Sequence, residues 1–415
     1  MQLASNTALG DNVGTTKLEG GAKLQLVAPG AYTISEPITI DSAGTPAIES
    51  LGLPNTWSGA ITLSNATTIA CTSNLTVTGS LNGAGALSWT GGAGSLCTLN
   101  TPNYGYTGSM EVKAGPQLVV SNGNALGTDG TLTVDSGAAV LFTSSGVANP
   151  LTLNGPGNGI VPTLRVTTLN TLLSGLITLG DAAVVLDVPL AASVNASAGL
   201  TGPGALNKSG AGVLAVNHAS TYLGATNVVA GTIKSGSSNA IPDGSVVTLS
   251  AGSLLNLNDF SEVIGTIAGA GDVALGFGSL TLSSAQAATY GGSVSGTGGV
   301  QFLGVGSETW TGSSAFSGAA AIPAGTLLLA NATWSATNVV VDGGALQLAN
   351  HGKITQSLSV QSGSLAPGAL VPRNGASGNL SLSAPSAFIA QCDGIADGKF
   401  SQLAVTGSVT LASGG

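Results

Sequence analysis

A degenerate cassette returns four times along the chain and constrains the fold more than any other feature of the sequence. Each copy opens with L-x-G-x-G-x-L, in which Ile or Val can replace a Leu. An aromatic residue follows each opening at a similar distance, from Leu81 to Tyr106 in the first copy and from Val294 to Phe316 in the last. A glycine stands two positions beyond each aromatic residue. A period in the twenties is typical of stacked units that cannot bury their apolar faces alone, so the sequence predicts a repeat architecture.

The positions that recur in the cassette are glycine and aromatic residues, and we expect them to build the repeat. Glycine and aromatic residues form turns and cores. A catalytic or metal site would not require either of them in every repeat. Three further glycines, each nine positions after an aromatic residue, belong to the same set. The predicted structural positions are Gly83, Gly85, Tyr106, Gly108, Gly115, Gly202, Gly204, Tyr222, Gly224, Gly231, Gly269, Gly271, Tyr290, Gly292, Gly296, Gly298, Phe316, Gly318 and Gly325.

Short alternating runs, such as residues 132–134, 246–249 and 339–341, predict strands of three to six residues. Clusters of Gly, Asn, Asp, Ser and Pro between them predict turns. A sandwich or barrel needs longer strands and a closing topology. The sequence predicts an all-β fold: a right-handed parallel β-helix, or β-solenoid, with about three short strands per coil. At about 22 residues per coil, we expect roughly 19 coils in the chain.

The predicted domain organisation is a single continuous solenoid over residues 1–415. The run N-T-A-L-G-D at 6–11 echoes N-A-L-G at 124–127, which lies inside a cassette, so the chain begins in mid-pattern. Solenoids need polar caps at their ends. We therefore expect a segment of a larger protein, with no signal peptide and no separate C-terminal translocator barrel within it.

The composition excludes several classes of protein. Hydrophobic residues make up 43% of the chain and charged residues only 7%, which argues against disorder. The net charge is −9, and the nine Lys and Arg residues are scattered. We therefore expect no binding of nucleic acid, because phosphates require a basic surface. No apolar run reaches the length of a membrane-spanning helix, so we expect no transmembrane segment.

Three phrases in the middle of the chain resemble a known repeat. Residues 206–214 read L-N-K-S-G-A-G-V-L, residues 220–226 read S-T-Y-L-G-A-T, and residues 229–233 read V-A-G-T-I. They resemble the passenger-associated transport repeat of bacterial autotransporters, in the autotransporter-associated β-strand repeat family. The resemblance implies a right-handed β-helix that is secreted or displayed on a bacterial surface. It implies no single activity, since such passengers include adhesins, aggregation factors and some enzymes.

The acidic residues of the sequence predict no catalytic site. The nearest acidic pairs, Asp129/Asp135, Asp181/Asp187 and Asp393/Asp397, each flank a turn, where Asp is common for structural reasons. Asp259 and Glu262 close a strand beside Phe260, and we interpret them as turn residues too. We interpret the two histidines, His218 and His351, as surface loop residues.

We predict no catalytic residue, no metal site and no cofactor. The phrase G-A-G-D at 269–272 approaches a calcium-binding repeat but does not recur. T-x-T occurs at 76–78 and 131–133 without a common register, so ice binding is not predicted.

The cysteines leave two readings open. Cys71 and Cys97 lie about one coil apart, where neighbouring strands would permit a disulfide, but two buried free thiols fit equally well. We expect Cys392 to be a free buried thiol.

The sequence predicts an extracellular or cell-surface structural or adhesive rod that acts by self-association or weak multivalent contacts. The expected partners are copies of itself, neighbouring segments of the same parent protein, or host or cell-surface glycans. Two alternatives stay open. One is a carbohydrate-active β-helix enzyme, a polysaccharide lyase or hydrolase, and the other is a passive spacer that presents a functional tip.

Overall fold

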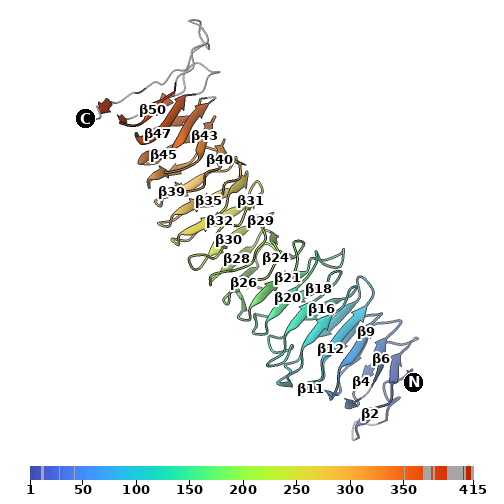
Figure 1. Ribbon diagram of the computed structural model, residues 1–415. Helices are drawn as coiled ribbons and strands as arrows, with labels where there is room; N and C mark the ends of the chain where they lie inside the picture. The colour runs from blue at the N-terminus through green and yellow to red at the C-terminus, as the bar shows by residue number, and fades with distance from the viewer. Residues whose placement is uncertain are drawn as a thin grey trace. The chain divides into compact units, whose positions relative to one another are not determined.

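The computed structural model describes residues 1–10, 14–27, 29–41, 43–349, 351–367, 375–376, 379–389, 405 and 408–412. Over these ranges the protein consists of strands and turns, with no helix. The chain divides into two compact units, Met1–Asn217 with Thr221–Gly224 and His218–Ser220 with Ala225–Gly415. Within each unit the strands stack coil upon coil (Figure 1).

Three ladders of parallel strands run through the first unit. The first ladder contains β1 (Gln2–Leu3), β3 (Ala22–Leu26), β6 (Ala43–Ser50), β9 (Thr67–Cys71), β12 (Leu87–Gly91), β15 (Met110–Val112), β17 (Leu132–Val134), β20 (Leu151–Leu153), β23 (Ile177–Leu179) and β26 (Leu200–Thr201). The second ladder contains β2 (Thr16–Leu18), β5 (Ile38–Ile40), β8 (Ile61–Leu63), β11 (Leu81–Gly83) and β14 (Gly105–Tyr106). A separate sheet follows it, with β19 (Gly146–Val147), β22 (Thr171–Leu173), β25 (Ser193–Ala196) and β28 (Val213–Val216). The third ladder contains β4 (Thr33–Ile34), β7 (Asn55–Trp57), β10 (Leu75–Val77), β13 (Leu96–Leu99), β16 (Gln117–Val120), β18 (Ala139–Phe142), β21 (Leu164–Val166), β24 (Val185–Asp187) and β27 (Leu206–Ser209).

The second unit repeats the plan with three main ladders. One contains β29 (Thr226–Val228), β31 (Val247–Leu249), β34 (Ile267–Gly269), β37 (Ala288–Tyr290), β40 (Ser307–Trp310) and β43 (Thr326–Ala330). Another contains β30 (Thr232–Ser235), β32 (Leu254–Asn256), β35 (Asp272–Ala274), β38 (Val294–Gly296) and β41 (Ala315–Phe316). The third contains β33 (Glu262–Ile264), β36 (Leu280–Leu282), β39 (Val300–Phe302), β42 (Ala320–Ile322), β45 (Asn338–Ala349), β47 (Ser357–Pro367), β49 (Leu380–Ser383) and β51 (Val409–Ala412), and the remaining strands are β44 (Thr333–Trp334), β46 (Lys353–Ile354), β48 (Gly375–Ala376) and β50 (Ala387–Phe388).

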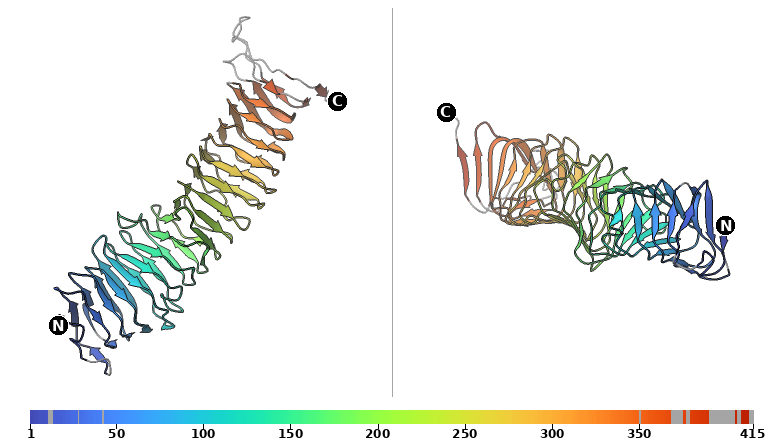
Figure 2. Two further views of the ribbon diagram at one scale, coloured as in Figure 1. Left: turned by 180° about the vertical axis from the view of Figure 1, so that it is seen from behind. Right: turned by 90° about the horizontal axis from the view of Figure 1, so that it is seen from below.

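Corresponding residues of neighbouring coils pair in register. Leu75 on β10 pairs with Asn55 on β7, in the coil before it, and with Cys97 on β13, in the coil after it. Figure 2 shows the same stacking of strands from two further sides. The prediction of an all-β parallel solenoid with about three strands per coil is confirmed. The continuity of one solenoid through residues 1–415 stays a prediction.

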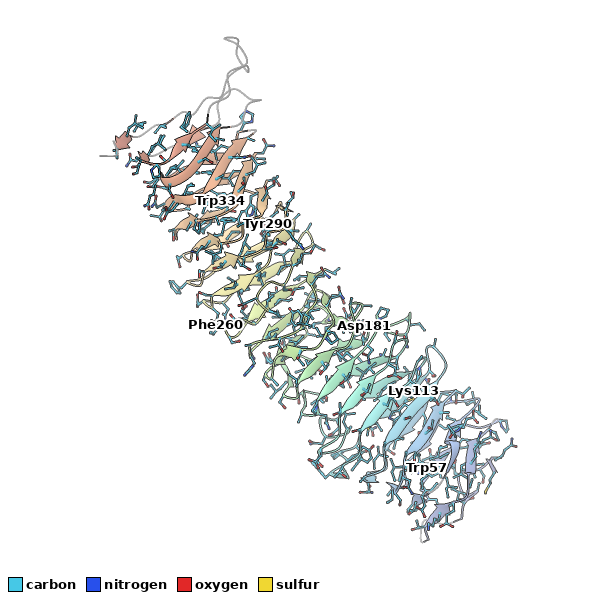
Figure 3. The ribbon with its side chains drawn as sticks, in the orientation of Figure 1. Trp57, Lys113, Asp181, Phe260, Tyr290 and Trp334 are labelled. Atoms are coloured by element: carbon cyan, nitrogen blue, oxygen red, sulfur yellow. A yellow bond between two sulfur atoms is a disulfide. The ribbon has the colours of Figure 1, made fainter. Side chains whose placement is uncertain are left out.

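Alternation along each strand creates the core. In β8, Ile61 and Leu63 are buried, whereas Thr62 between them is half-exposed. Successive side chains of a strand point to opposite sides, so an apolar-polar-apolar triplet lines the interior and leaves a polar column outside. Trp57 on β7 is fully buried in the interior of the first unit (Figure 3).

Aromatic side chains gather at one level of the second unit. The ring centroids of Tyr290 and Trp310 lie 5.0 Å apart, and those of Trp310 and Trp334 lie 4.9 Å apart, both edge to face. Phe302 contacts both tryptophans, and Phe316 contacts Trp334. Such edge-to-face contacts are favourable beyond the apolar area that they bury. These five aromatic side chains therefore form one local cluster in the core of the second unit.

Candidate functional site

In two of the cassettes, the aromatic residue is hydrogen-bonded to the cassette opening one coil earlier. The hydroxyl of Tyr106 donates to the carbonyl oxygens of Gly85, at 3.1 Å, and of Ser109, at 2.9 Å. The hydroxyl of Tyr290 donates to the carbonyl oxygen of Gly271 at 2.9 Å. All four aromatic residues of the cassettes are buried. The recurring spacing of aromatic and glycine is therefore a contact between coils.

The glycine two positions beyond the aromatic is required by close packing. A β-carbon at Gly108 would overlap the carbonyl oxygen of Gly85, and one at Gly292 would overlap that of Gly271. At Gly83, the first glycine of an opening, φ is +93°, a conformation that other residues rarely adopt. The other predicted glycines follow the same pattern: Gly224 and Gly318 pack on the carbonyls of Gly204 and Gly298, and φ is positive at Gly115, Gly202, Gly231, Gly269, Gly296 and Gly325.

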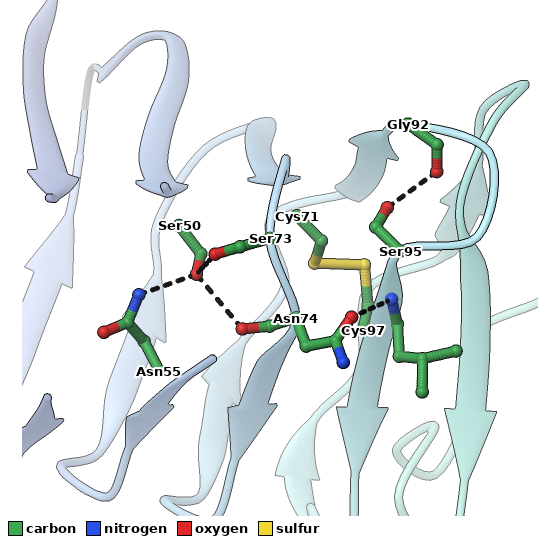
Figure 4. Close-up of a disulfide and its surroundings, with 9 residues drawn as sticks. Ser50, Asn55, Cys71, Ser73, Asn74, Gly92, Ser95 and Cys97 are labelled. Carbon is green, nitrogen blue, oxygen red and sulfur yellow. Dashed lines mark hydrogen bonds between the residues drawn. A yellow bond between two sulfur atoms is a disulfide. The ribbon is translucent and has the colours of Figure 1, made fainter. Parts of the chain in front are cut away.

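A disulfide joins Cys71, at the end of β9, to Cys97 in β13, with their Cα atoms 5.9 Å apart (Figure 4). Both cysteines are fully buried. The bridge connects two different ladders in adjacent coils, since Cys71 pairs with Gly91 and Cys97 pairs with Leu75. Cys392 lies outside the described residues.

A buried polar network lies beside this disulfide. The Nδ2 atom of Asn55 donates to the hydroxyl oxygen of Ser50 at 3.0 Å, and this hydroxyl donates to the carbonyl oxygen of Asn74 at 3.1 Å. The amide oxygen of Asn74 in turn accepts a bond from the Leu96 backbone N–H at 3.0 Å (Figure 4). The corner before β7, β10 and β13 is therefore held by side-chain hydrogen bonds as well as by the covalent bridge.

Lys208, the lysine in the phrase L-N-K-S-G-A-G-V-L, is buried on β27. Its Nζ atom donates to the carbonyl oxygens of Ser209, at 2.8 Å, and Gly210, at 2.6 Å. Burial lowers the pKa of Lys208 to about 8, and the charge of Asp187 opposes this shift. The amine satisfies backbone carbonyls at a corner, which is a structural role.

Two glutamates face the interior of the second unit. Glu262 on β33 accepts hydrogen bonds from the Ser235 hydroxyl at 2.8 Å and from the Ala240 N–H at 3.1 Å. Burial raises the pKa of Glu262 to about 7, and these hydrogen bonds oppose the shift. Burial likewise raises the pKa of Glu308 on β40 to about 8. Our interpretation of Glu262 from sequence as a turn residue was wrong, because the alternation of β33 turns it inward.

The acidic pairs noted in the sequence have structural partners. Asp181 (Figure 3) accepts hydrogen bonds from the Gly155 N–H at 2.7 Å and the Ala183 N–H at 2.8 Å. Asp187 lies 3.4 Å from the Nε atom of Arg165, in an ion pair between β21 and β24. The other acidic positions with a described partner are Asp129, bonded to Thr128, and Asp135, paired with Lys113, whereas Asp393 and Asp397 lie outside the described residues.

The remaining candidate residues lie apart from one another. His218 is exposed, with its Nδ1 atom 3.2 Å from the carbonyl oxygen of Ala219, and His351 is exposed in a turn. Asp272, in the calcium-like phrase, accepts hydrogen bonds from the backbone N–H and the hydroxyl of Ser293. Among the described residues, no three of His, Cys, Asp and Glu are grouped as metal ligands.

The outer face of the third ladder carries polar groups in two columns over its first four strands. Thr33, Thr56, Thr76 and Thr98 pair one above another on β4, β7, β10 and β13. Two positions further on, the chain continues with Ser35, Ser58, Thr78 and Asn100, which are likewise half-exposed or exposed. We call these eight residues the hydroxyl face. The four tripeptides T-x-S, T-x-S, T-x-T and T-x-N thus share one register. Their spacing in the sequence differs from coil to coil, so the sequence alone does not reveal this register.

These features define a class of protein: a parallel β-solenoid whose recurring residues pack coil on coil. Over 257 residues the chain is 31% identical to a protein named adhesin BmaC autotransporter from Brucella suis biovar 1 (strain 1330). The aligned part covers 55% of this chain and 7% of that relative, so the chain spans only a small part of its length. No family model matches the chain, and no solved structure matches it. The described residues contain no helix that is long and apolar enough to cross a membrane.

Proposed function

We propose that this chain is part of a surface-displayed or secreted passenger of the autotransporter type, and that it acts there as an adhesive or structural β-solenoid. The observation that carries the proposal is the 31% identity to an autotransporter adhesin over 257 residues. The phrases at 206–214, 220–226 and 229–233, which resemble the passenger-associated transport repeat, support it further.

The proposed mechanism is mechanical. Each coil hydrogen-bonds its backbone to the coils before and after it, and the cassette glycines allow these coils to approach closely. Because outward positions recur once per coil, a weak contact at one coil is repeated along the face. Linked weak contacts bind far more tightly together than each does alone. The chain has 9 basic and 18 acidic residues in 415, so charge repulsion between copies is weak.

The proposed partners are copies of this chain, neighbouring segments of the same parent protein, and glycans of a host or bacterial surface. The proposed location is the bacterial surface or the extracellular space. The proposed role is not enzymatic, because the recurring positions are structural. In addition, Asp129, Asp135, Asp181, Asp187, Glu262 and Asp272 bond to backbone groups, hydroxyls or basic residues.

The test uses the purified chain in two assays. Sedimentation velocity over a range of concentrations measures self-association, and beads coated with the chain measure attachment to epithelial cells. Self-association or attachment above that of uncoated beads is expected. A passive spacer would give neither result. Turnover of a polysaccharide, lost on replacement of a single Asp, would contradict the proposal in favour of an enzyme.

A further inference from the structure

The hydroxyl face is an ordered array of polar groups whose threonine column has no partner within the described part of the protein. The side-chain hydroxyls of Thr33, Thr56, Thr76 and Thr98 make no hydrogen bond to any described residue. Unpartnered threonine hydroxyls also occur elsewhere in the first unit, at Thr133 and Thr152 on the first ladder, whereas Thr221 donates to the hydroxyl of Thr201 at 2.9 Å. Free hydroxyls at fixed positions can both donate and accept, so the hydroxyl face offers a repeated set of hydrogen-bonding sites.

The geometry of the array follows from its strands. Paired strands lie about 4.8 Å apart, and alternate residues of one strand lie about 6.7 Å apart. The residues between the two columns point inward and are buried: Ile34, Trp57, Val77 and Leu99. The hydroxyl face therefore forms a nearly flat lattice on a packed apolar layer.

Two cross-links support the strands of the hydroxyl face. Cys97, next to Thr98 on β13, is tied by the disulfide to Cys71 (Figure 4). Asn55, next to Thr56 on β7, belongs to the buried polar network. Both supports are adjacent to the threonine column. A rigid array loses little entropy when it binds, which favours recognition by many weak hydrogen bonds.

Charge distinguishes this face from the other faces of the same unit. The second ladder carries Lys17, which forms an ion pair with Asp41 at 3.1 Å. The first ladder carries Glu49 and, one coil beyond the hydroxyl face, Glu111. The eight residues of the hydroxyl face are all uncharged. An uncharged ligand matches this face, because a charged one would lose hydration without gaining a counter-charge.

The chain carries an exposed aromatic ring four residues after the last residue of the array. Asn100, the last residue of the second column, begins the turn that leads to Tyr104. Tyr104 is 65% exposed, and its hydroxyl accepts a hydrogen bond from the Nδ2 atom of Asn124 at 3.2 Å. This bond orients the ring while its apolar body stays in contact with solvent. Tyrosine in such a setting combines an apolar surface with a polar edge, which suits contact with a sugar ring.

We propose that the hydroxyl face of β4, β7, β10 and β13 binds a neutral linear polysaccharide, with the chain lying along the two columns and a sugar ring against Tyr104. This inference rests on the proposed function and names the ligand class and the surface that would serve it. The ligand would hydrogen-bond to the threonine hydroxyls, and its own hydroxyls would replace solvent water there.

The experiment measures binding of the full chain to amorphous cellulose, chitin and cross-linked dextran, with polygalacturonate as an acidic comparison. We expect the chain to co-sediment with at least one neutral polysaccharide and not with polygalacturonate. The variant T56V/T76V keeps the shape and strand preference of these positions but removes two free hydroxyls, and it should weaken binding about tenfold. Tyr104→Ala should weaken it as well.

The matched control is T133V/T152V, which removes two threonine hydroxyls from the first ladder of the same unit. It should bind as the unchanged chain does, and thermal unfolding of both double variants verifies that they are folded. Equal loss in both variants, or binding by none of the neutral probes, overturns the inference. The inference is also overturned if the unchanged chain binds no polysaccharide but inhibits the growth of ice crystals, and T56V/T76V does not. That result would show that the hydroxyl face binds ice. Attachment to cells or self-association that persists in T56V/T76V leaves the proposed function standing.

Discussion

The hydroxyl of Tyr290 donates a hydrogen bond to the carbonyl oxygen of Gly271, which lies 19 residues earlier in the chain and one coil away. The same side chain donates to the carbonyl oxygen of Ser293 at 3.0 Å. Gly292 stands between these groups, where a β-carbon would overlap the Gly271 carbonyl. The aromatic residue and the two glycines of the cassette therefore form one contact between two coils, and its loss should destabilise both.

Enlarging the glycine should cost more stability than removing the hydroxyl. Gly108→Ala should lower the free energy of unfolding by about 1–3 kcal/mol, because the added carbon overlaps the Gly85 carbonyl. Tyr106→Phe should cost about 1 kcal/mol, since Phe316 fills the same place in another cassette without a hydroxyl. Chemical denaturation followed by circular dichroism measures both. Gly92→Ala is the control, because no atom lies within 4 Å of its added carbon. Equal effects at Gly108 and Gly92 would contradict the close-packing argument.

Reduction of the disulfide should destabilise the first unit. The bond between Cys71 and Cys97 closes a loop with a sequence separation of 26. A disulfide that closes a loop of this length is expected to raise the free energy of unfolding by about 3 kcal/mol, mainly by restricting the unfolded chain. Denaturation with and without a reductant measures the difference. In the variant C71A/C97A the reductant should have no further effect, and a shift as large as in the unchanged chain would assign the effect to another group.

The second unit should lose stability as the pH rises through neutrality. Because burial raises the pKa of Glu262 from 4.5 to about 7, the folded state keeps a proton that the unfolded chain releases. The contribution of Glu262 to the free energy of unfolding is therefore fully present below pH 4.5. It is lost between pH 4.5 and about 7, at roughly 1.4 kcal/mol per pH unit. Glu308 adds a fall of the same sign from pH 4.5 to about pH 8, so the slopes of the two groups add below pH 7. Denaturation midpoints at pH 5, 6, 7 and 8 measure the slope. Glu262→Gln cannot ionise and should roughly halve the slope below pH 7, where Glu308 still contributes, so an unchanged slope in that variant would count against Glu262 as a source.

Replacement of the buried lysine should depend on the size of the new side chain. Lys208→Met keeps the length of the stem and removes a charge that burial disfavours, so we expect little change or a small gain in stability at pH 7. Lys208→Ala leaves a cavity and should cost about 2–4 kcal/mol. Thermal unfolding of both variants measures the difference. A large loss in Lys208→Met would show instead that the bonds to the Ser209 and Gly210 carbonyls decide the stability of this corner.

Most of the fold could be predicted because its signals are local. The alternation of apolar and polar residues in a triplet such as Ile61-Thr62-Leu63 indicates which side of the strand is buried. The recurring glycines indicate where neighbouring coils pack closely. The inward position of Glu262 was missed because hydropathy places a carboxylate outside by default. Only the register of β33, with Glu262 opposite Leu280, assigns it to the interior.

The sequence by itself determined the architecture of this protein: short strands, glycine corners and a period of about one coil, which can bury an apolar face only by stacking. The tertiary structure alone decided which distant residues share a column. Coils differ in length, since the step from Leu254 to its partner Asp272 is much shorter than the step from Leu151 to its partner Ile177. Equal spacing in the chain therefore does not mean equal height in the stack. For that reason Thr76 finds its partners in Thr56 and Thr98, and the hydroxyl face emerges only when hydrogen bonding between strands sets the register.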